Sequence, residues 1–176
     1  YLPETSMLEV RLGGSGHHAI EVEGIAWERS QLGTPPISEL SFDFDHDAEG
    51  WRPSNDLDVF RVSDGVLHTR TTGGDPYMVR SNCHISAGHV ATVRVRMALD
   101  PGMGEGAQLF WATADEPGMA QSRSMHFDAV ADGELHELTV DVGEHPRWTG
   151  TITALRLDPT VGEPIGRVQI DAIWGE

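Results

Sequence analysis

Residues 89–97 read His89-Val90-Ala91-Thr92-Val93-Arg94-Val95-Arg96-Met97, and every second side chain from Ala91 onward is apolar. Successive side chains of a β-strand point to opposite faces, so this alternation predicts a strand with one buried face. Residues 136–142 carry a similar apolar stripe. No segment shows a sustained helical period, and we therefore expect a fold built from strands.

Short runs of this kind recur along the chain and are separated by turn residues such as Ser63-Asp64-Gly65 and Asp100-Pro101-Gly102. Gly, Pro and Asp in such clusters mark turns between strands. The predicted strands cover residues 39–45, 58–62, 65–71, 77–85, 89–98, 106–113, 123–130, 134–142, 151–157 and 166–174. This spacing predicts an all-β fold, a β-sandwich or jelly roll of antiparallel strands.

The start of the chain resembles its end. Residues 20–25 alternate like a weaker copy of residues 168–173, which predicts an N-terminal β-hairpin within residues 1–30. One explanation is that residues 1–30 are the tail of a preceding similar module, and another is that amphipathic hairpins resemble one another. We divide the chain into residues 1–30, a linker at residues 31–38 and a β-sandwich module at residues 39–176.

Charge and composition exclude several classes of partner. The chain has 28 acidic residues and 12 basic ones, all arginine, for a net charge of -16. Phosphate binding depends on clustered cations, so nucleic acid is not an expected partner. No apolar run approaches the roughly 18 residues of a membrane span, and membrane insertion is not expected. Cys83 is the only cysteine, so no disulfide forms within the chain.

The order of short motifs along residues 39–176 resembles that of the galactose-binding-like jelly rolls that serve as carbohydrate-binding modules of polysaccharide-active enzymes. The motifs that carry the resemblance are Phe42-Asp43-Phe44-Asp45, Gly50-Trp51, Gly65-Val66-Leu67, Gly74-Asp75-Pro76, Val93-Arg94-Val95-Arg96-Met97, Gln108-Leu109-Phe110-Trp111, Trp148-Thr149-Gly150, Leu155-Arg156-Leu157-Asp158-Pro159 and Val168-Gln169-Ile170-Asp171. The resemblance implies a non-catalytic domain that binds a polysaccharide or oligosaccharide. It also implies adjacent domains in the same polypeptide and a location outside the cell or on its surface.

A sugar site needs an aromatic plane for the C–H face of the ring and planar polar groups for its hydroxyls. The predicted ligand-binding residues are Tyr77, Arg80, Arg94, Arg96, Gln108 and Trp111. The two arginines of residues 89–97 share one strand face and favour an acidic or sulfated polysaccharide, because guanidinium pairs bidentately with carboxylate or sulfate. Two alternatives stay open: Trp111 packs in the core, and the arginines pair with nearby carboxylates.

The acidic run at residues 43–49 suggests calcium, which takes carboxylate and carbonyl oxygens as ligands. It departs from an EF-hand loop, since Ala48 stands where glycine is needed. The family resemblance implies instead one structural calcium between the first and last strands, which would bring Asp43 or Asp45 near Asp171. The alternative is that these are acidic turn residues on an acidic surface.

An enzyme domain and a structural spacer or docking domain are the two alternatives to a sugar-binding module. The sequence contains no HExxH, no GxSxG and no glycine-rich phosphate loop, so we expect no enzyme activity. A glycan-cleaving domain would need two converging carboxylates, for which Asp75 and Glu134 are candidates. A structural spacer or docking domain is the other alternative, and it predicts that another domain covers the face that carries Arg94 and Arg96.

Overall fold

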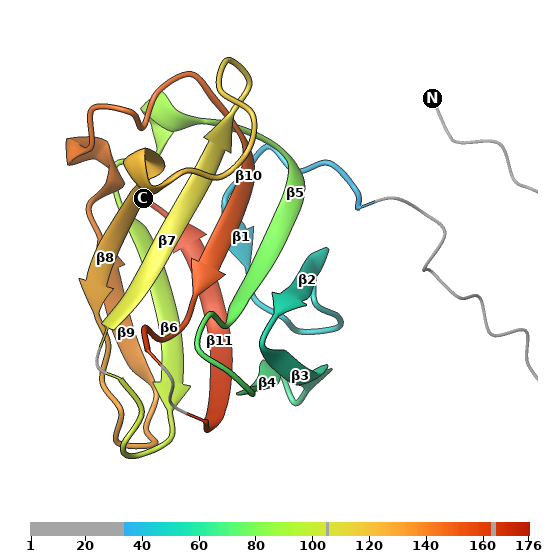
Figure 1. Cartoon of the computed structure of the whole chain (residues 1–176). Coiled ribbons are helices and arrows are strands. Elements are labelled where there is room, and N and C mark those ends of the chain that lie inside the picture. The colour runs from blue at the N-terminus through green and yellow to red at the C-terminus, as the bar shows by residue number, and fades with distance from the viewer. Residues whose placement is uncertain (1–33, 105, 163–164) are drawn as a thin grey trace, which may run out of the picture. The chain divides into compact units, whose positions relative to one another are not determined.

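The computed structural model describes residues 34–104, 106–162 and 165–176, which form two antiparallel sheets packed face to face (Figure 1). The all-β sandwich prediction is confirmed. The predicted N-terminal hairpin at residues 1–30 lies outside the described residues, so the proposed division of the chain there stays a prediction.

One sheet has six strands in the order β3-β4-β11-β6-β9, with β1 pairing β11, and the other has five in the order β2-β5-β10-β7-β8. The bounds in the six-stranded sheet are β1 Ser41–Phe42, β3 Leu57–Ser63, β4 Val66–Thr71, β6 Val93–Leu99, β9 His136–Val140 and β11 Arg167–Gly175. Those in the five-stranded sheet are β2 Trp51–Asn55, β5 Tyr77–Ser86, β7 Gly106–Thr113, β8 Ser124–Asp128 and β10 Thr151–Asp158. Single 3₁₀ turns lie at Ala87–His89, Gln121–Arg123 and Val142–Glu144. Figure 1 shows the five-stranded sheet in front of β6, β9 and β11.

Each predicted strand corresponds to an observed one, and β2 is the strand that the sequence pattern missed. Its sequence Trp-Arg-Pro-Ser-Asn shows no alternation, and Pro53 lacks the N–H that a ladder uses. β2 tolerates this proline because it is the outer strand of its sheet, next to β5. The strand predicted at residues 89–98 begins later in the structure: residues 87–89 form a 3₁₀ turn, and β6 starts at Val93.

The core lies between the sheets and is filled by alternate side chains of both. From the six-stranded sheet, Val93, Val95 and Met97 are at most 1% exposed, as the pattern of residues 89–97 predicts. From the five-stranded sheet, Leu155 and Leu157 of β10 are fully buried. Burial of this continuous apolar layer is the main source of stability for a sandwich of this kind.

The inward direction of Leu155 and Leu157 fixes which side chains point outward. Arg156, between them, lies opposite Val79 of β5 on one side and Phe110 of β7 on the other. Asp158 lies opposite Gln108 of β7. The central strands β5, β10 and β7 therefore present polar and aromatic side chains together on the outer face of the five-stranded sheet.

Residues 34–38, the described part of the predicted linker, lie along β5. Ile37 forms an isolated parallel bridge with Cys83, and Asn82 Nδ2 donates a hydrogen bond of 2.7 Å to the Thr34 carbonyl. Cys83 is 1% exposed, and burial raises the pKa of its thiol to about 11. This segment is thus attached to the sandwich by both backbone and side-chain bonds.

Candidate functional site

The six predicted ligand-binding residues lie in three separate places. Tyr77 and Gln108 lie on the outer face of the five-stranded sheet, and Arg94 and Arg96 lie on the outer face of the six-stranded sheet. The other two, Arg80 and Trp111, are fully buried. The residues that the sequence grouped together therefore do not form one site.

Arg94 and Arg96 are paired with carboxylates of their own sheet. Arg94 contacts Glu137 at 3.3 Å and Glu176 at 3.2 Å, and Arg96 contacts Asp171 at 3.2 Å. Arg94 also donates a hydrogen bond to the Thr139 hydroxyl at 2.8 Å. This arrangement corresponds to the second alternative from the sequence, in which the arginines pair with nearby carboxylates.

Trp111 packs in the core and does not present its ring to a ligand. Its indole meets the ring of Trp148 edge-on at 5.1 Å and the ring of His145 at 4.8 Å between centroids. Its Nε1–H donates to the Arg147 carbonyl at 3.0 Å, so the one polar atom is satisfied. Leu109 and Trp111 share the inward face of β7, which leaves the outward face to Gln108 and Phe110.

Arg80 also points inward, next to β2. Its guanidinium donates to the carbonyls of Ser81 and Pro35, the latter at 2.7 Å, and lies 5.9 Å from the Phe42 ring centroid. Burial lowers the pKa of Arg80 against the opposing effect of nearby Glu49. Its position is that of a structural anchor for residues 34–38, so it is removed from the candidate site.

The site that the structure does assemble is centred on Arg156 of β10. Arg156 Nε and Nη2 donate to the two oxygens of Asp158 at 2.6 and 2.7 Å. Nη2 also donates to Asp75 Oδ1, in the loop before β5, at 2.8 Å. A bidentate arginine–carboxylate pair of this length is among the strong hydrogen-bonded pairs of proteins.

Two aromatic rings pack against the same guanidinium. The Arg156 Cζ lies 3.6 Å from the Tyr77 ring centroid and 4.7 Å from that of Phe110. Cation–π contacts at this range hold the guanidinium plane in place. Because Arg156 covers a face of Tyr77, this tyrosine positions the arginine, while Phe110 is among the residues that line the adjacent pocket.

A pocket of about 180 Å³ lies over this network. Its floor comes from β7 and β10, through the side chains Gln108, Phe110, Arg156 and Asp158, and loops complete it. Gln108 is 6% and Asp158 7% exposed. Polar side chains so well covered, yet lining an open pocket, form a built polar surface and not an ordinary solvated sheet face.

The network of Arg156, Asp158 and Asp75 has more acidic groups than basic ones. Burial raises the pKa of Asp158, and this effect outweighs the lowering influence of Arg156. Burial acts against the charge of Arg156, but the bonds and charges of Asp158 and Asp75 outweigh it and raise the pKa of Arg156. Arg156 therefore stays a cation, and with two carboxylates around it the site carries an excess of negative charge.

Sequence reasoning missed Arg156, Asp158 and Phe110 as site residues, although two signals were present. In Leu155-Arg156-Leu157-Asp158 the polar side chains alternate with leucines, which predicts that both face outward together. In Gln108-Leu109-Phe110 the same rule places the glutamine and the phenylalanine on one face. Their convergence with Asp75 depends on strand pairing that the sequence does not show.

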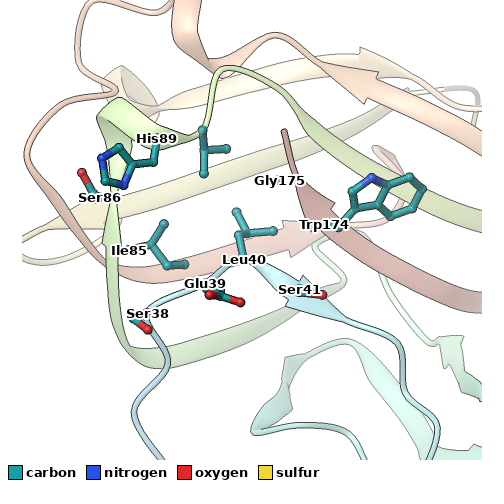
Figure 2. Close-up of a pocket in the computed structure, with 10 residues that line it drawn as sticks. Ser38, Glu39, Leu40, Ser41, Ile85, Ser86, His89, Trp174 and Gly175 are labelled. Carbon is teal, nitrogen blue, oxygen red and sulfur yellow. The ribbon is translucent and has the colours of Figure 1, made fainter.

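Two larger hollows lie elsewhere on the sandwich. One of about 500 Å³ opens beside β1 and β5, with Trp174 and His89 at its two ends and Leu40 and Ile85 between them (Figure 2). The other, of about 520 Å³, lies between the edge strands β8 and β9. Neither has a buried charged group among its lining side chains, and we place the candidate site at the Arg156 pocket for that reason.

The three residues predicted to hold calcium do not gather into a cation site. Within residues 34–104, 106–162 and 165–176, no three His, Cys, Asp or Glu side chains group as metal ligands would. The predicted pairing of the first and last strands is present, as β1 pairs β11, but Asp171 pairs with Arg96. Asp43 Oδ1 accepts the backbone N–H of Asp45 at 3.1 Å, as acidic turn residues do.

Calcium binding stays a prediction that a melting experiment tests. A cation that binds only the folded state stabilises it by mass action, so chelation should lower the melting temperature and added calcium should restore it. Asp171→Ala should abolish that response if Asp171 is a ligand. A melting temperature that changes with neither chelator nor calcium would refute the predicted calcium site.

No family model matches the chain, and no curated protein matches it. Among solved structures, the low-affinity xylan-binding module CBM86 from the gut symbiont Roseburia intestinalis matches with a TM-score of 0.51 and 14% identity, covering 77% of this chain and 92% of that one. The apo structure of BiXyn10A CBM1 matches with a TM-score of 0.50 and 10% identity, covering 78% and 96%. The chain thus shares its β-sandwich fold with these two carbohydrate-binding modules.

The part of the chain that the structure describes holds no helix with the length and apolar character needed to cross a bilayer.

Proposed function

We propose that this chain is a non-catalytic carbohydrate-binding module whose sugar site is the pocket above Arg156. The observation that carries the proposal is the network in which Arg156 joins Asp158 and Asp75 and packs on Phe110, at the floor of a walled pocket. Planar hydrogen-bonding groups next to an aromatic ring are what a sugar needs. The shared fold with a xylan-binding module supports the same class of ligand.

The charge of the pocket favours a neutral polysaccharide. Arg156 is the only cation among the lining residues, and its charge is already balanced by Asp158 and Asp75. A uronate or sulfate group placed there would meet an excess of carboxylate. The acidic or sulfated target stays a prediction attached to Arg94 and Arg96, whose carboxylate partners leave it without structural support.

The same geometry favours binding over cleavage. Glycoside hydrolysis needs two carboxylates that flank the scissile bond. In this pocket Asp75 and Asp158 both hold the guanidinium of Arg156, which occupies the space between them. Glu134, the other candidate from the sequence, lies in the loop after β8, where its backbone N–H bonds to Asp132. A place beside catalytic domains and a location outside the cell or on its surface are part of this proposal.

Affinity electrophoresis against neutral, uronic and sulfated polysaccharides, with xylan among the neutral ones, tests the proposal. We expect retardation by a neutral member. Gln108→Ala should weaken binding by about 2- to 10-fold, because a hydrogen bond contributes about 0.5–1.5 kcal/mol. No retardation by any member, together with no binding of any short oligosaccharide in calorimetry, would overturn the sugar-binding function and favour the structural spacer.

Matched controls come from the opposite face of the molecule. Gln169 of β11 lies between buried Val168 and Ile170, so it points outward from the six-stranded sheet. Gln169→Ala should bind like the wild type. The Arg94→Ala/Arg96→Ala double variant should also bind like the wild type. If it fails to bind an anionic glycan while Gln108→Ala binds normally, the site is on the arginine face.

A further inference from the structure

We propose that the Arg156 pocket holds a single sugar residue at the end of a glycan chain and does not bind along the chain. This inference rests on the proposed function and specifies which part of the glycan is recognised. It follows from the size of the pocket, from the loops that wall it and from the polar atoms left free inside it.

Size is the first observation. The pocket has a volume of about 180 Å³, whereas pockets for drug-sized ligands have roughly 300 to 1,000 Å³. The two larger hollows on this molecule have volumes of about 500 and 520 Å³. The Arg156 pocket has room for one ring.

Thr160, Val161 and Gly162, which follow β10, form the first wall, and the first two are held from behind by hydrogen bonds. The Thr160 hydroxyl donates to the Gly104 carbonyl at 3.3 Å, and the Val161 N–H donates to the Gly106 carbonyl at 2.8 Å. Thr160 is 1% exposed. These bonds tie the loop to the start of β7, so this wall does not depend on a ligand to form.

The loop before β5 forms the second wall. The Asp75 N–H donates to Asp56 Oδ2 at 3.0 Å, and Asn55 Nδ2 donates to the Asp75 carbonyl at 2.8 Å. Gly73 lies so close to Asp56 that a Cβ atom there would sit 2.5 Å from its carboxylate. The wall that carries Asp75 is therefore attached to the end of β2.

Gln121 forms the third wall, on the side of β8. The loop that carries it is held by Arg123, whose Nη2 donates to the Gly118 carbonyl at 2.8 Å and whose Nη1 lies 3.2 Å from Glu116. The Gln121 carbonyl accepts the Ser124 hydroxyl at 2.9 Å. Like the other two, this wall is braced by bonds within the protein.

The pocket keeps polar atoms for a ligand. Among the hydrogen bonds of the described residues, Arg156 uses Nε and Nη2, and Asp75 uses Oδ1. Arg156 Nη1 is thus left to donate and Asp75 Oδ2 to accept. Gln108 donates to Ser124 through Nε2, which leaves its Oε1 to accept. These groups match neighbouring hydroxyls, each of which can donate one hydrogen bond and accept another.

The pocket has three walls held by internal hydrogen bonds and room for one sugar ring, and this shape limits how a glycan can enter. A residue inside a chain carries a glycosidic bond on two sides and needs two exits, whereas a terminal residue needs one. No residue from the second half of β5 or the first half of β10 lines the pocket, so the remainder of the glycan leaves in that direction.

Isothermal titration calorimetry with oligosaccharides of graded length tests this inference. The probes are xylose and glucose oligomers of one to six β-1,4-linked residues, with a series of uronic acid oligomers as the anionic set. Recognition of an end predicts a molar affinity that changes less than about threefold between the disaccharide and the hexasaccharide. An increase of tenfold or more over that range would overturn end recognition and show a site along the chain.

A variant of the third wall supplies a second readout. Gln121→Ala should weaken disaccharide and hexasaccharide binding by the same factor, about 2- to 10-fold, because both place the same residue in the pocket. Gln169→Ala, on the other sheet, is the matched control and should leave both unchanged. If Gln121→Ala leaves the affinity for both probes unchanged while Gln108→Ala weakens it, the wall does not touch the ligand and end recognition fails.

The two proposals fail in different ways. A polysaccharide that binds with an affinity rising with oligomer length leaves the sugar-binding function intact and refutes end recognition alone. An absence of binding to every polysaccharide and every oligomer refutes both. Retention of polysaccharides with many chain ends over linear ones of the same sugar would support end recognition.

Discussion

Replacing Arg156 with methionine is expected to weaken sugar binding strongly and to make the stability of the fold fall more steeply as pH rises. Methionine keeps the apolar stem over Tyr77 and Phe110 but removes the guanidinium that joins Asp158 and Asp75. Arg156 Nη1 is the charged donor left for the sugar, and a hydrogen bond to a charged group contributes about 1.5 to 3 kcal/mol, or roughly 10- to 150-fold in affinity. Calorimetry against the best glycan measures this loss.

The effect on stability follows from the carboxylate left behind. Burial already raises the pKa of Asp158 above its ordinary value of 3.8, and without Arg156 only the smaller influence of His126 opposes that rise. A group whose pKa is raised by folding contributes stability below its ordinary pKa and loses it as pH rises through the folded pKa. Arg156→Met should therefore lose more stability at pH 7 than at a pH below 3.8, where Asp158 is protonated in both states.

A second substitution separates the two effects. The double variant Arg156→Met/Asp158→Asn has no buried charge at this site. Thermal unfolding should therefore show that much of the lost stability is recovered and that the excess pH dependence of stability is gone. Binding should stay as weak as in Arg156→Met, because the donor is still missing. An Arg156→Met variant that binds as the wild type does would contradict the assignment of this pocket.

Replacing Trp111 with alanine is expected to have the largest effect on stability. The indole is fully buried, packs edge-on against Trp148 and His145, and donates a hydrogen bond to the Arg147 carbonyl. Removal of a buried tryptophan costs about 3 to 5 kcal/mol, because it removes apolar contact and leaves a cavity. For a domain of this size the melting temperature should fall by about 6 to 20 °C.

Binding by the folded fraction distinguishes this structural role from a sugar contact. Trp111→Phe keeps most of the ring volume and loses the indole donor, so it should fold with a smaller loss of stability. Measured well below its melting temperature, this variant should bind glycan with the wild-type affinity. A normal melting temperature together with lost binding would show that Trp111 faces the ligand after all.

Much of the fold was predictable from the sequence because alternation is a local property. Val93, Val95 and Met97 are buried as the period of two requires, and the pattern also located the strands that place them. β2 escaped because Pro53 and its polar neighbours do not alternate, and only the presence of β5 beside it makes this segment a strand.

The candidate site was less accessible, and the reason lies in sequence distance. Arg156 and Asp75 are 81 residues apart, and their contact exists because β5 and β10 are neighbours in the sheet. Alternation separates Gln108 from Trp111 correctly, but it does not reveal which of the two faces is the core. Arg94 and Arg96 had the pattern of a binding face, but Arg94 pairs with Glu137 of β9 and Arg96 with Asp171 of β11, which are distant in the sequence.

The reactivity of the single cysteine can report local opening of the sandwich. Cys83 lies 1% exposed beneath residues 34–38, and a thiol with a pKa of about 11 holds almost no thiolate at neutral pH. A chromogenic thiol reagent therefore reacts with Cys83 only when residues 34–38 separate from β5. At reagent concentrations so high that the rate of colour development no longer increases with them, that rate in native buffer equals the rate of the separation, without denaturant and with no attached label.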